Sequence, residues 1–130
     1  MKGPMAAPVE VRTQTLWLED GIVHVKMKPN IQISLEDAQA AIRAISSMCE
    51  GKKCPALVDM RGLAGMDREA RRYFAGEETA KVESAAALLI ESPLSKAIGN
   101  FFMGLNKPII PTRLFTSEAE ALAWLKGFVR

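Results

Sequence analysis

The most informative part of the hydrophobic pattern spans residues 84–115. Residues 85–90 form a continuous apolar run without polar alternation, as expected for a strand covered on both faces of a sheet. Periodicity alone is equally compatible with a buried helix, but the run is short and stops at residues 91–93, which favours the strand. The pattern therefore predicts a central strand here.

A helix and an edge strand are predicted directly after this run. Ser92 is a suitable cap and Pro93 fits the first helical position, so the helix begins there and extends to about Asn106. Its apolar residues recur at three- and four-residue steps, which predicts one buried stripe: Leu94, Ala97, Ile98, Phe101, Phe102 and Leu105. Residues 112–115 follow as a short strand, which Pro111 places late or at a sheet edge.

The first third of the chain predicts an antiparallel hairpin. Residues 9–19 and 22–28 are rich in strand formers, and Asp20-Gly21 between them is a turn signal. Alternation in the second strand places Val23, Val25 and Met27 on one face. It places His24 on the other face, with the lysines, so that face is expected to be wet.

Three further helices follow from capping signals. Ser34 with Asp37 predicts a capping box for a helix that ends at Gly51. After a strand at residues 55–60, Asp67 caps a second helix that Gly76 breaks, with one more turn expected in residues 76–82. Ser117 caps the last helix, and Glu120 completes its box.

The element order β-β-α-β-α-β-α-β-α predicts an α/β domain. It implies a mixed, mostly parallel five-stranded sheet with an antiparallel N-terminal hairpin and four helices, which cover both faces or mainly one. The small residues and prolines of residues 1–8 indicate a disordered lead, and residues 9–130 form a single domain.

Composition narrows the function classes. The net charge of +2 on this chain of 130 residues is too small to indicate binding to nucleic acid or to an anionic membrane. No signal peptide and no apolar run of about 20 residues is present, so we expect a cytoplasmic protein without membrane insertion. The spacing of Cys49 and Cys54 fits no common zinc or redox motif and predicts two reduced thiols. We expect no cofactor.

Four polar residues follow two predicted neighbouring strands and form a candidate ligand site. Asp59 and Arg61 lie at the end of one strand, and Ser92 and Ser95 at the end of the other, where open α/β sheets bind ligands. A helix N-terminus at Ser92 could also hold an anion. In the structural alternative, Asp59 pairs with Arg61 and Ser92 caps its helix.

The single histidine and a cluster of arginines are two further candidates for a functional site, and each has an ordinary structural explanation. His24 is the only histidine, so most histidine-dependent chemistry lacks its usual partners and a solvated or hydrogen-bonded side chain is expected. Three arginines, Arg68, Arg71 and Arg72, lie among glutamates, which indicates a salt-bridged surface rather than one for RNA.

The helix that contains Phe102 and Met103 is apolar around more than half of its circumference. Deep burial of the whole helix explains this pattern. A partner surface or a small hydrophobic pocket explains it equally well.

The chain resembles a bacterial group of small proteins. The resemblance lies in the order of its elements and in residues 58–62, 92–102, 106–108 and 113–118. This group is related to the STAS domain of sporulation anti-sigma-factor antagonists and, more distantly, to CRAL-TRIO lipid-transfer domains. The resemblance covers roughly residue 9 to the end and implies a STAS-like fold. An antagonist of that family carries a phosphorylatable serine at a helix start where this chain has residues 65–70, and no serine is present there. Asp67 offers only a weak substitute for a phosphate.

Three functions follow in order of preference. The first is a non-enzymatic regulatory or interaction module, such as a signalling protein, that forms a homodimer or binds another regulatory protein through Phe102 and Met103. The second is a binder of a small apolar or acyl ligand, in analogy with lipid-transfer relatives. The third is an enzyme that uses Asp59, Arg61 and Ser92 or Ser95.

Overall fold

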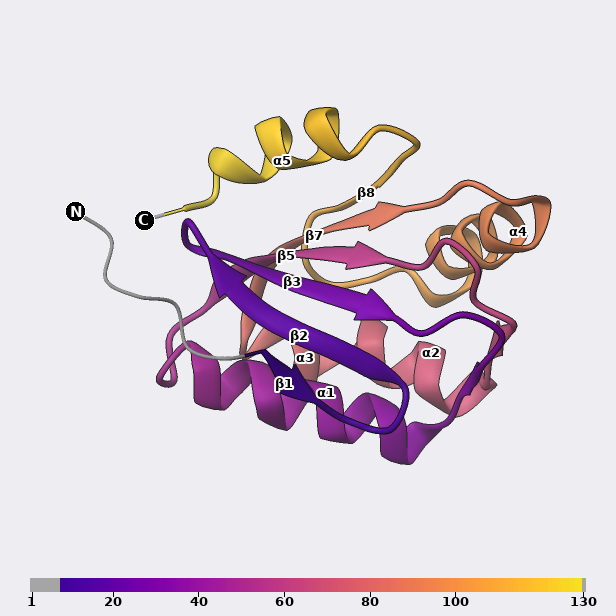
Figure 1. Cartoon of the computed structure of the whole chain (residues 1–130), viewed down its shortest axis with the longest axis horizontal. Coiled ribbons are helices and arrows are strands. Elements are labelled where there is room, and N and C mark those ends of the chain that lie inside the picture. Colours follow the sequence, from indigo (N-terminus) through magenta and orange to yellow (C-terminus); the bar gives the residue numbers. More distant parts are fainter. Residues whose placement is uncertain (1–7, 130) are drawn as a thin grey trace.

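A six-stranded mixed sheet runs through the computed structural model, which describes residues 8–129 (Figure 1). Its strands occur in the order β1 (Val9–Glu10), β2 (Gln14–Glu19), β3 (Ile22–Met27), β5 (Cys54–Asp59), β7 (Glu83–Leu89) and β8 (Thr112–Phe115). Strands β1, β2 and β3 are antiparallel, and β3, β5, β7 and β8 are parallel. A second, two-stranded sheet pairs β4 (Gln32–Ile33) with β6 (Gly65–Met66).

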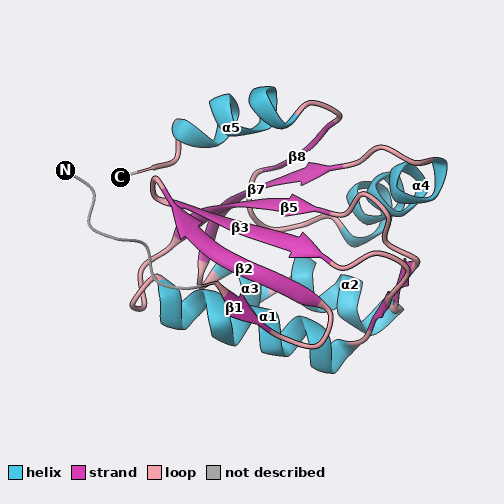
Figure 2. Cartoon of the chain, viewed as in Figure 1, coloured by secondary structure: helices cyan, strands magenta, loops and turns pink. Residues whose placement is uncertain are grey.

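Helices cover both faces of the large sheet (Figure 2). They are α1 (Leu35–Met48), α2 (Arg68–Ala75), α3 (Glu77–Ala80), α4 (Pro93–Phe101), the π-helix η1 (Phe102–Asn106) and α5 (Glu118–Lys126). Helices α1, α2 and α3 lie on one side of the sheet and α5 lies on the other (Figure 1). Residues of α4 and η1 pack with α1 and α2, so α5 alone covers the opposite face.

Strand β7 is buried in the way that the apolar run predicts. It pairs with both β5 and β8, and residues 85–90 are at most 6% exposed. Ala86, Leu88 and Ile90 face the α1–α2 side, whereas Ala85, Ala87 and Leu89 face α5. Two covered faces explain why polar alternation is absent. Strand β8 is an edge strand, as Pro111 indicates.

The expected number of five strands is wrong, because residues 9–19 do not form one strand. A turn at residues 11–13 separates β1 from β2, closed by hydrogen bonds between Val11 and Gln14 in both directions (2.9 and 3.4 Å). Strand β1 then folds back onto β2. The β4–β6 pair was not expected either, since each of its strands has only two residues.

The wet face expected on β3 is confirmed at Lys26, which is exposed, but is wrong for Ile22 and His24. Ile22 is 2% and His24 is 9% exposed, because α5 and Trp17 cover that side of the hairpin. The imidazole of His24 stacks on Trp17 with ring centroids 5.0 Å apart. Burial lowers the pKa of His24, although Glu19, Glu118 and Asp20 oppose that shift.

The capping signals place the helix starts correctly, with differences in detail. Ser34 and Asp37 form the predicted capping box, and Asp37 also accepts two hydrogen bonds from Arg12 (3.1 and 2.6 Å). Asp67 is at the N-cap position but makes no capping bond; its carboxylate accepts from Gln32 instead (2.8 Å). Ser117 accepts from the backbone N–H of Glu120.

Helix α4 is rotated relative to the expected stripe. Ser95 and Gly99 are its buried residues, and Gly99 is needed there because a Cβ would lie 3.1 Å from Leu114. Leu94, Ala97 and Phe101 face solvent. The small residues decide the packing, since they let the helix approach the sheet closely.

None of the helices in the described part of the chain combines the length and hydrophobicity that crossing a bilayer requires. The predicted disordered lead, residues 1–8, lies outside the described residues except for Pro8, which is exposed.

Candidate functional site

The structure brings Asp59 and Arg61 together at the end of β5. The guanidinium of Arg61 donates to both carboxylate oxygens of Asp59 (3.0 and 2.9 Å), and its backbone N–H donates to one of them (3.1 Å). Glu118 lies 3.7 Å from the same guanidinium. The pKa of Arg61 is raised by the hydrogen bond with Asp59. This bidentate pair is the structural alternative that the sequence left open.

The side chains of Ser92 and Ser95 accept hydrogen bonds from backbone N–H groups at the start of α4. Ser92 Oγ accepts from the Ser95 N–H (3.1 Å), and the fully buried Ser95 Oγ accepts from the Glu91 N–H (2.9 Å). Although Asp59 and Leu89 are paired neighbours at this sheet edge, the two pairs of side chains hydrogen-bond within their own segments. Ligand binding by these four residues stays a prediction.

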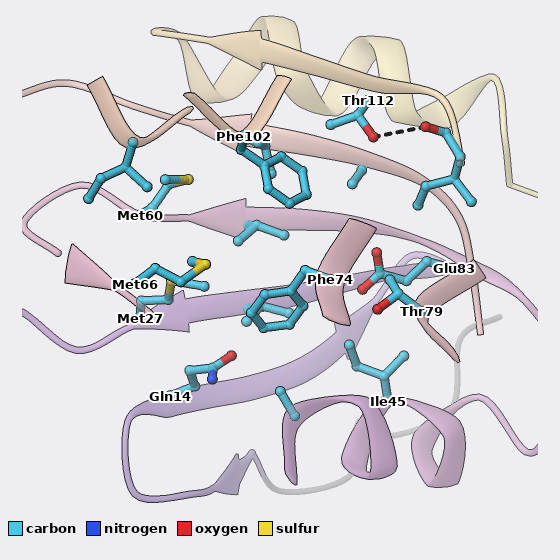
Figure 3. A pocket seen from close by; sticks show the side chains of 17 residues that line it. Gln14, Met27, Ile45, Met60, Met66, Phe74, Thr79, Glu83, Phe102 and Thr112 are labelled. Atoms are coloured by element: carbon cyan, nitrogen blue, oxygen red, sulfur yellow. Dashed lines mark hydrogen bonds between the residues drawn. The ribbon is translucent and has the colours of Figure 1, made fainter. Parts of the chain in front are cut away.

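A partly open cavity of about 50 Å³ lies between the sheet and the helices α1, α2, α3, α4 and η1 (Figure 3). Its walls are mostly apolar and include three methionines and two phenylalanines: Met27, Met60, Met66, Phe74 and Phe102. A water-sized group needs about 10–15 Å³, so the cavity accommodates roughly four such groups. The sequence left open a small hydrophobic pocket at the helix that contains Phe102, and Phe102 lines this cavity.

Glu83 is the one carboxylic acid on the cavity wall in the described chain, beside Thr79 (Figure 3). It is 4% exposed, and no group of residues 8–129 donates a hydrogen bond to it. Burial alone raises the pKa of Glu83 to about 8. A buried carboxyl group without a partner is unusual and is typical of functional sites.

The cysteines lie next to Glu83. Both are free thiols, as predicted, within the described residues. Burial raises the pKa of Cys49 to about 12, and Cys54 and Glu83 contribute to this shift. The Cys49 thiol therefore stays protonated and inert near neutral pH.

Comparisons with known proteins bear on the family and the fold. Residues 16–129 match the family described as Domain of unknown function (DUF7793). The chain belongs to the DUF7793 family. No curated protein matches this DUF7793 member significantly.

Two solved structures are similar to this DUF7793 member, and the first of them bears on its fold. One is an uncharacterised protein of the DUF3478 family with a SpoIIAA-like fold from Shewanella loihica PV-4. It is 20% identical, with a TM-score of 0.55, over 96% of this chain and 98% of that chain. A protein with unknown function from Arthrobacter sp. FB24 is 31% identical, with a TM-score of 0.32, over 85% and 97% of the two chains. The first likeness confirms the predicted STAS-like fold, whereas the relation to CRAL-TRIO domains stays a prediction.

The surface around η1 differs from the one that the sequence predicts. Phe102 is 8% exposed and lines the cavity, and Met103 is partly buried against the same core. Four other apolar side chains of the same segment are exposed: Leu94, Phe101, Leu105 and Ile109. The guanidinium of Arg71 lies 4.9 Å from the Phe101 ring centroid. In this DUF7793 member, the exposed apolar segment therefore lies beside Phe102, not at it.

Proposed function

We propose that this DUF7793 member is a non-enzymatic module that binds a small, largely apolar molecule in its partly open cavity. The observation that carries this proposal is the apolar cavity with the unpaired carboxyl group of Glu83 on its wall. An apolar pocket with a few polar groups and a perturbed pKa is the usual form of a small-molecule site.

The size of the cavity restricts the ligand. About 50 Å³ is well below the roughly 150 Å³ of an engineered cavity that holds benzene. A long acyl chain does not fit in this conformation. Methionine side chains adapt readily to a ligand, and the thioethers of Met27, Met60 and Met66 allow moderate expansion.

The non-enzymatic part of the proposal rests on the residues at the sheet edge. Asp59 is occupied by Arg61, and Ser92 and Ser95 by the start of α4. Within residues 8–129, no three His, Cys, Asp or Glu side chains are grouped to hold a metal ion.

Xenon tests the proposed cavity directly, because it binds to apolar cavities without needing a polar group. We expect xenon to shift the methyl NMR signals of Met27, Met60 and Met66. Ala86→Leu places three more carbons in the cavity and should abolish these shifts, whereas the exposed control Ala97→Leu should retain them. Unchanged methionine signals in the folded wild-type protein at several atmospheres of xenon would exclude the proposed function.

A second function, homodimerisation, is favoured by the exposed apolar segment. Leu105 and Ile109 are 63% and 60% exposed, and Leu94 and Phe101 are each 48% exposed. All four come from one continuous segment, residues 94–109, so a two-fold dimer would pack this segment against its own copy.

Leu105→Asp tests the dimer. We expect the wild-type protein to elute as a dimer in size exclusion at high micromolar concentration and the variant as a monomer, because a buried carboxylate without a partner disfavours the interface. The exposed control Lys96→Asp on the same helix should leave the elution volume unchanged. A wild-type monomer at that concentration would rule out this second function.

A further inference from the structure

Three polar side chains on the cavity wall already use their hydrogen-bond donors within the protein. Thr79 Oγ donates to the Tyr73 carbonyl and Thr112 Oγ to the Ile110 carbonyl, each at 2.9 Å. The amide nitrogen of Gln14 donates to Thr13 Oγ (3.3 Å) and to the Asp37 carbonyl (3.5 Å). These three side chains can therefore still accept hydrogen bonds from a ligand in the cavity, but they have no free donor.

Two acceptor groups on the wall receive no hydrogen bond from the described residues. The amide oxygen of the fully buried Gln14 has no donor. The carboxyl group of Glu83 receives none either, and no basic side chain lines the cavity with it. Figure 3 shows Glu83 and Gln14 on the wall at opposite ends of the cavity, with Phe74 between them.

We propose that the cavity binds a small alkylamine, with its nitrogen on the Glu83 carboxyl group and its alkyl chain on the apolar wall between Glu83 and Phe74 (Figure 3). This inference rests on the proposed ligand-binding function and specifies the polar group of the ligand. A ligand rich in donors complements a wall rich in acceptors, because each unpaired buried acceptor costs free energy until it receives a hydrogen bond.

Proton transfer accounts for the charge on both partners. Burial disfavours an isolated charge on either partner, but two opposite charges that form together at contact distance stabilise each other. An amine that enters in its neutral form takes the proton of the Glu83 carboxyl group, and an ammonium–carboxylate pair results. No other reactant is needed. The titratable neighbours of Glu83 are the Cys49 and Cys54 thiols, and the raised pKa of Cys49 keeps it neutral.

The competing ligand classes fit less well. A carboxylate ligand offers no hydrogen-bond donor, so the Gln14 amide oxygen and the other acceptors on the wall would stay without one. An alcohol donates one hydrogen bond, compared with three from an ammonium group. The order of affinity should therefore be amine, then alcohol, then acid.

The volume of the cavity limits the affinity that the experiment has to measure. About 50 Å³ holds roughly four non-hydrogen atoms. At the ceiling for very small ligands, this gives a Kd no tighter than about 10⁻⁵–10⁻⁴ M. Millimolar titration followed by NMR is therefore suitable, with propylamine, propan-1-ol and propionate as chain-matched probes at pH 7.

We expect propylamine to shift the methyl signals of Ile45, which lies beside Glu83 on the cavity wall, with at least tenfold higher affinity than propan-1-ol and no measurable binding of propionate. Glu83→Gln should lower the affinity for propylamine at least tenfold and leave that for propan-1-ol within about twofold. Glu77→Gln, which removes an exposed carboxylate of α3, is the matched control and should change neither.

Two results would overturn the inference. One is equal affinity of the wild-type protein for propylamine and propan-1-ol; the other is unchanged propylamine affinity in Glu83→Gln. Either result, with xenon still shifting the methionine signals, removes the amine and leaves the proposed cavity function in place. Failure of xenon and all three probes removes both.

Discussion

Replacing Glu83 with Gln should remove a large pH dependence of stability. In the folded protein the pKa of Glu83 is about 8, compared with 4.5 for an unperturbed glutamate. Between these values the folded state binds more protons than the unfolded state, so stability falls as pH rises from about 4.5 to about 8. The full contribution of Glu83 is present below pH 4.5 and is lost above pH 8.

The expected slope is at most about 1.4 kcal/mol per pH unit, and the total loss is of order 3–5 kcal/mol. Urea denaturation of both proteins between pH 5 and 8 measures the difference. The free energy of unfolding of the wild-type protein should fall over this range. That of Glu83→Gln should change with pH only as far as the other titratable groups make it change. Glu77→Gln is the control for an exposed carboxylate. Parallel curves for the wild-type protein and Glu83→Gln would show that the Glu83 carboxyl group has a charge partner in solution.

Phe101 and Phe102 should respond very differently to truncation, although they are neighbours in the sequence. Phe102 is 8% exposed and forms part of the cavity wall, whereas Phe101 is 48% exposed. Phe102→Ala should destabilise the fold by about 3 kcal/mol, because a large buried side chain is lost next to an existing space. Phe101→Ala should cost about 1 kcal/mol or less, mainly through its contact with Arg71.

Urea denaturation at one pH compares the two variants, and Leu105→Ala provides a second exposed control in η1. Equal losses for Phe101→Ala and Phe102→Ala would mean that α4 is rotated from the orientation described above. That result would also place the exposed apolar segment, and with it the proposed dimer contact, on a different face.

The parts of the fold that depend on local signals could be predicted from the sequence. The continuous run of residues 85–90 indicated a strand covered twice, and Ser34 with Asp37 indicated a helix start. These signals depend on neighbouring residues only. The face of β3 that carries His24 could not be predicted in the same way, because α5 covers it from almost 100 positions further along the chain.

The orientation of α4 shows a second limit. Its apolar residues outnumber the positions available on the buried face, so periodicity alone could not choose among them. Close approach to Leu114 and Ile90 at Gly99 made the choice. Small residues within an apolar helix were the available signal, and Ser95 with Gly99 marks the buried side.

The candidate site was only partly accessible to sequence reasoning. Asp59 and Arg61 were expected to lie together, and they do. A small hydrophobic pocket at the helix that contains Phe102 was one of two alternatives, but its volume and its other walls could not be predicted, since a void depends on how several elements fail to fill one space. Glu83 had a usable signal: it is an acidic residue just before the apolar run, in a strand that is shielded on both faces.

The π-helix η1 connects the interior with the exterior within a single turn. Phe102 closes the cavity, and Leu105, three residues later, is exposed to solvent. An occupant that displaced the Phe102 ring would also change the presentation of Leu105 to a docking molecule. Binding of a ligand in the cavity and binding of a second molecule at Leu105 would then be thermodynamically linked. Each binding event would change the affinity of the protein for the other partner by the same factor.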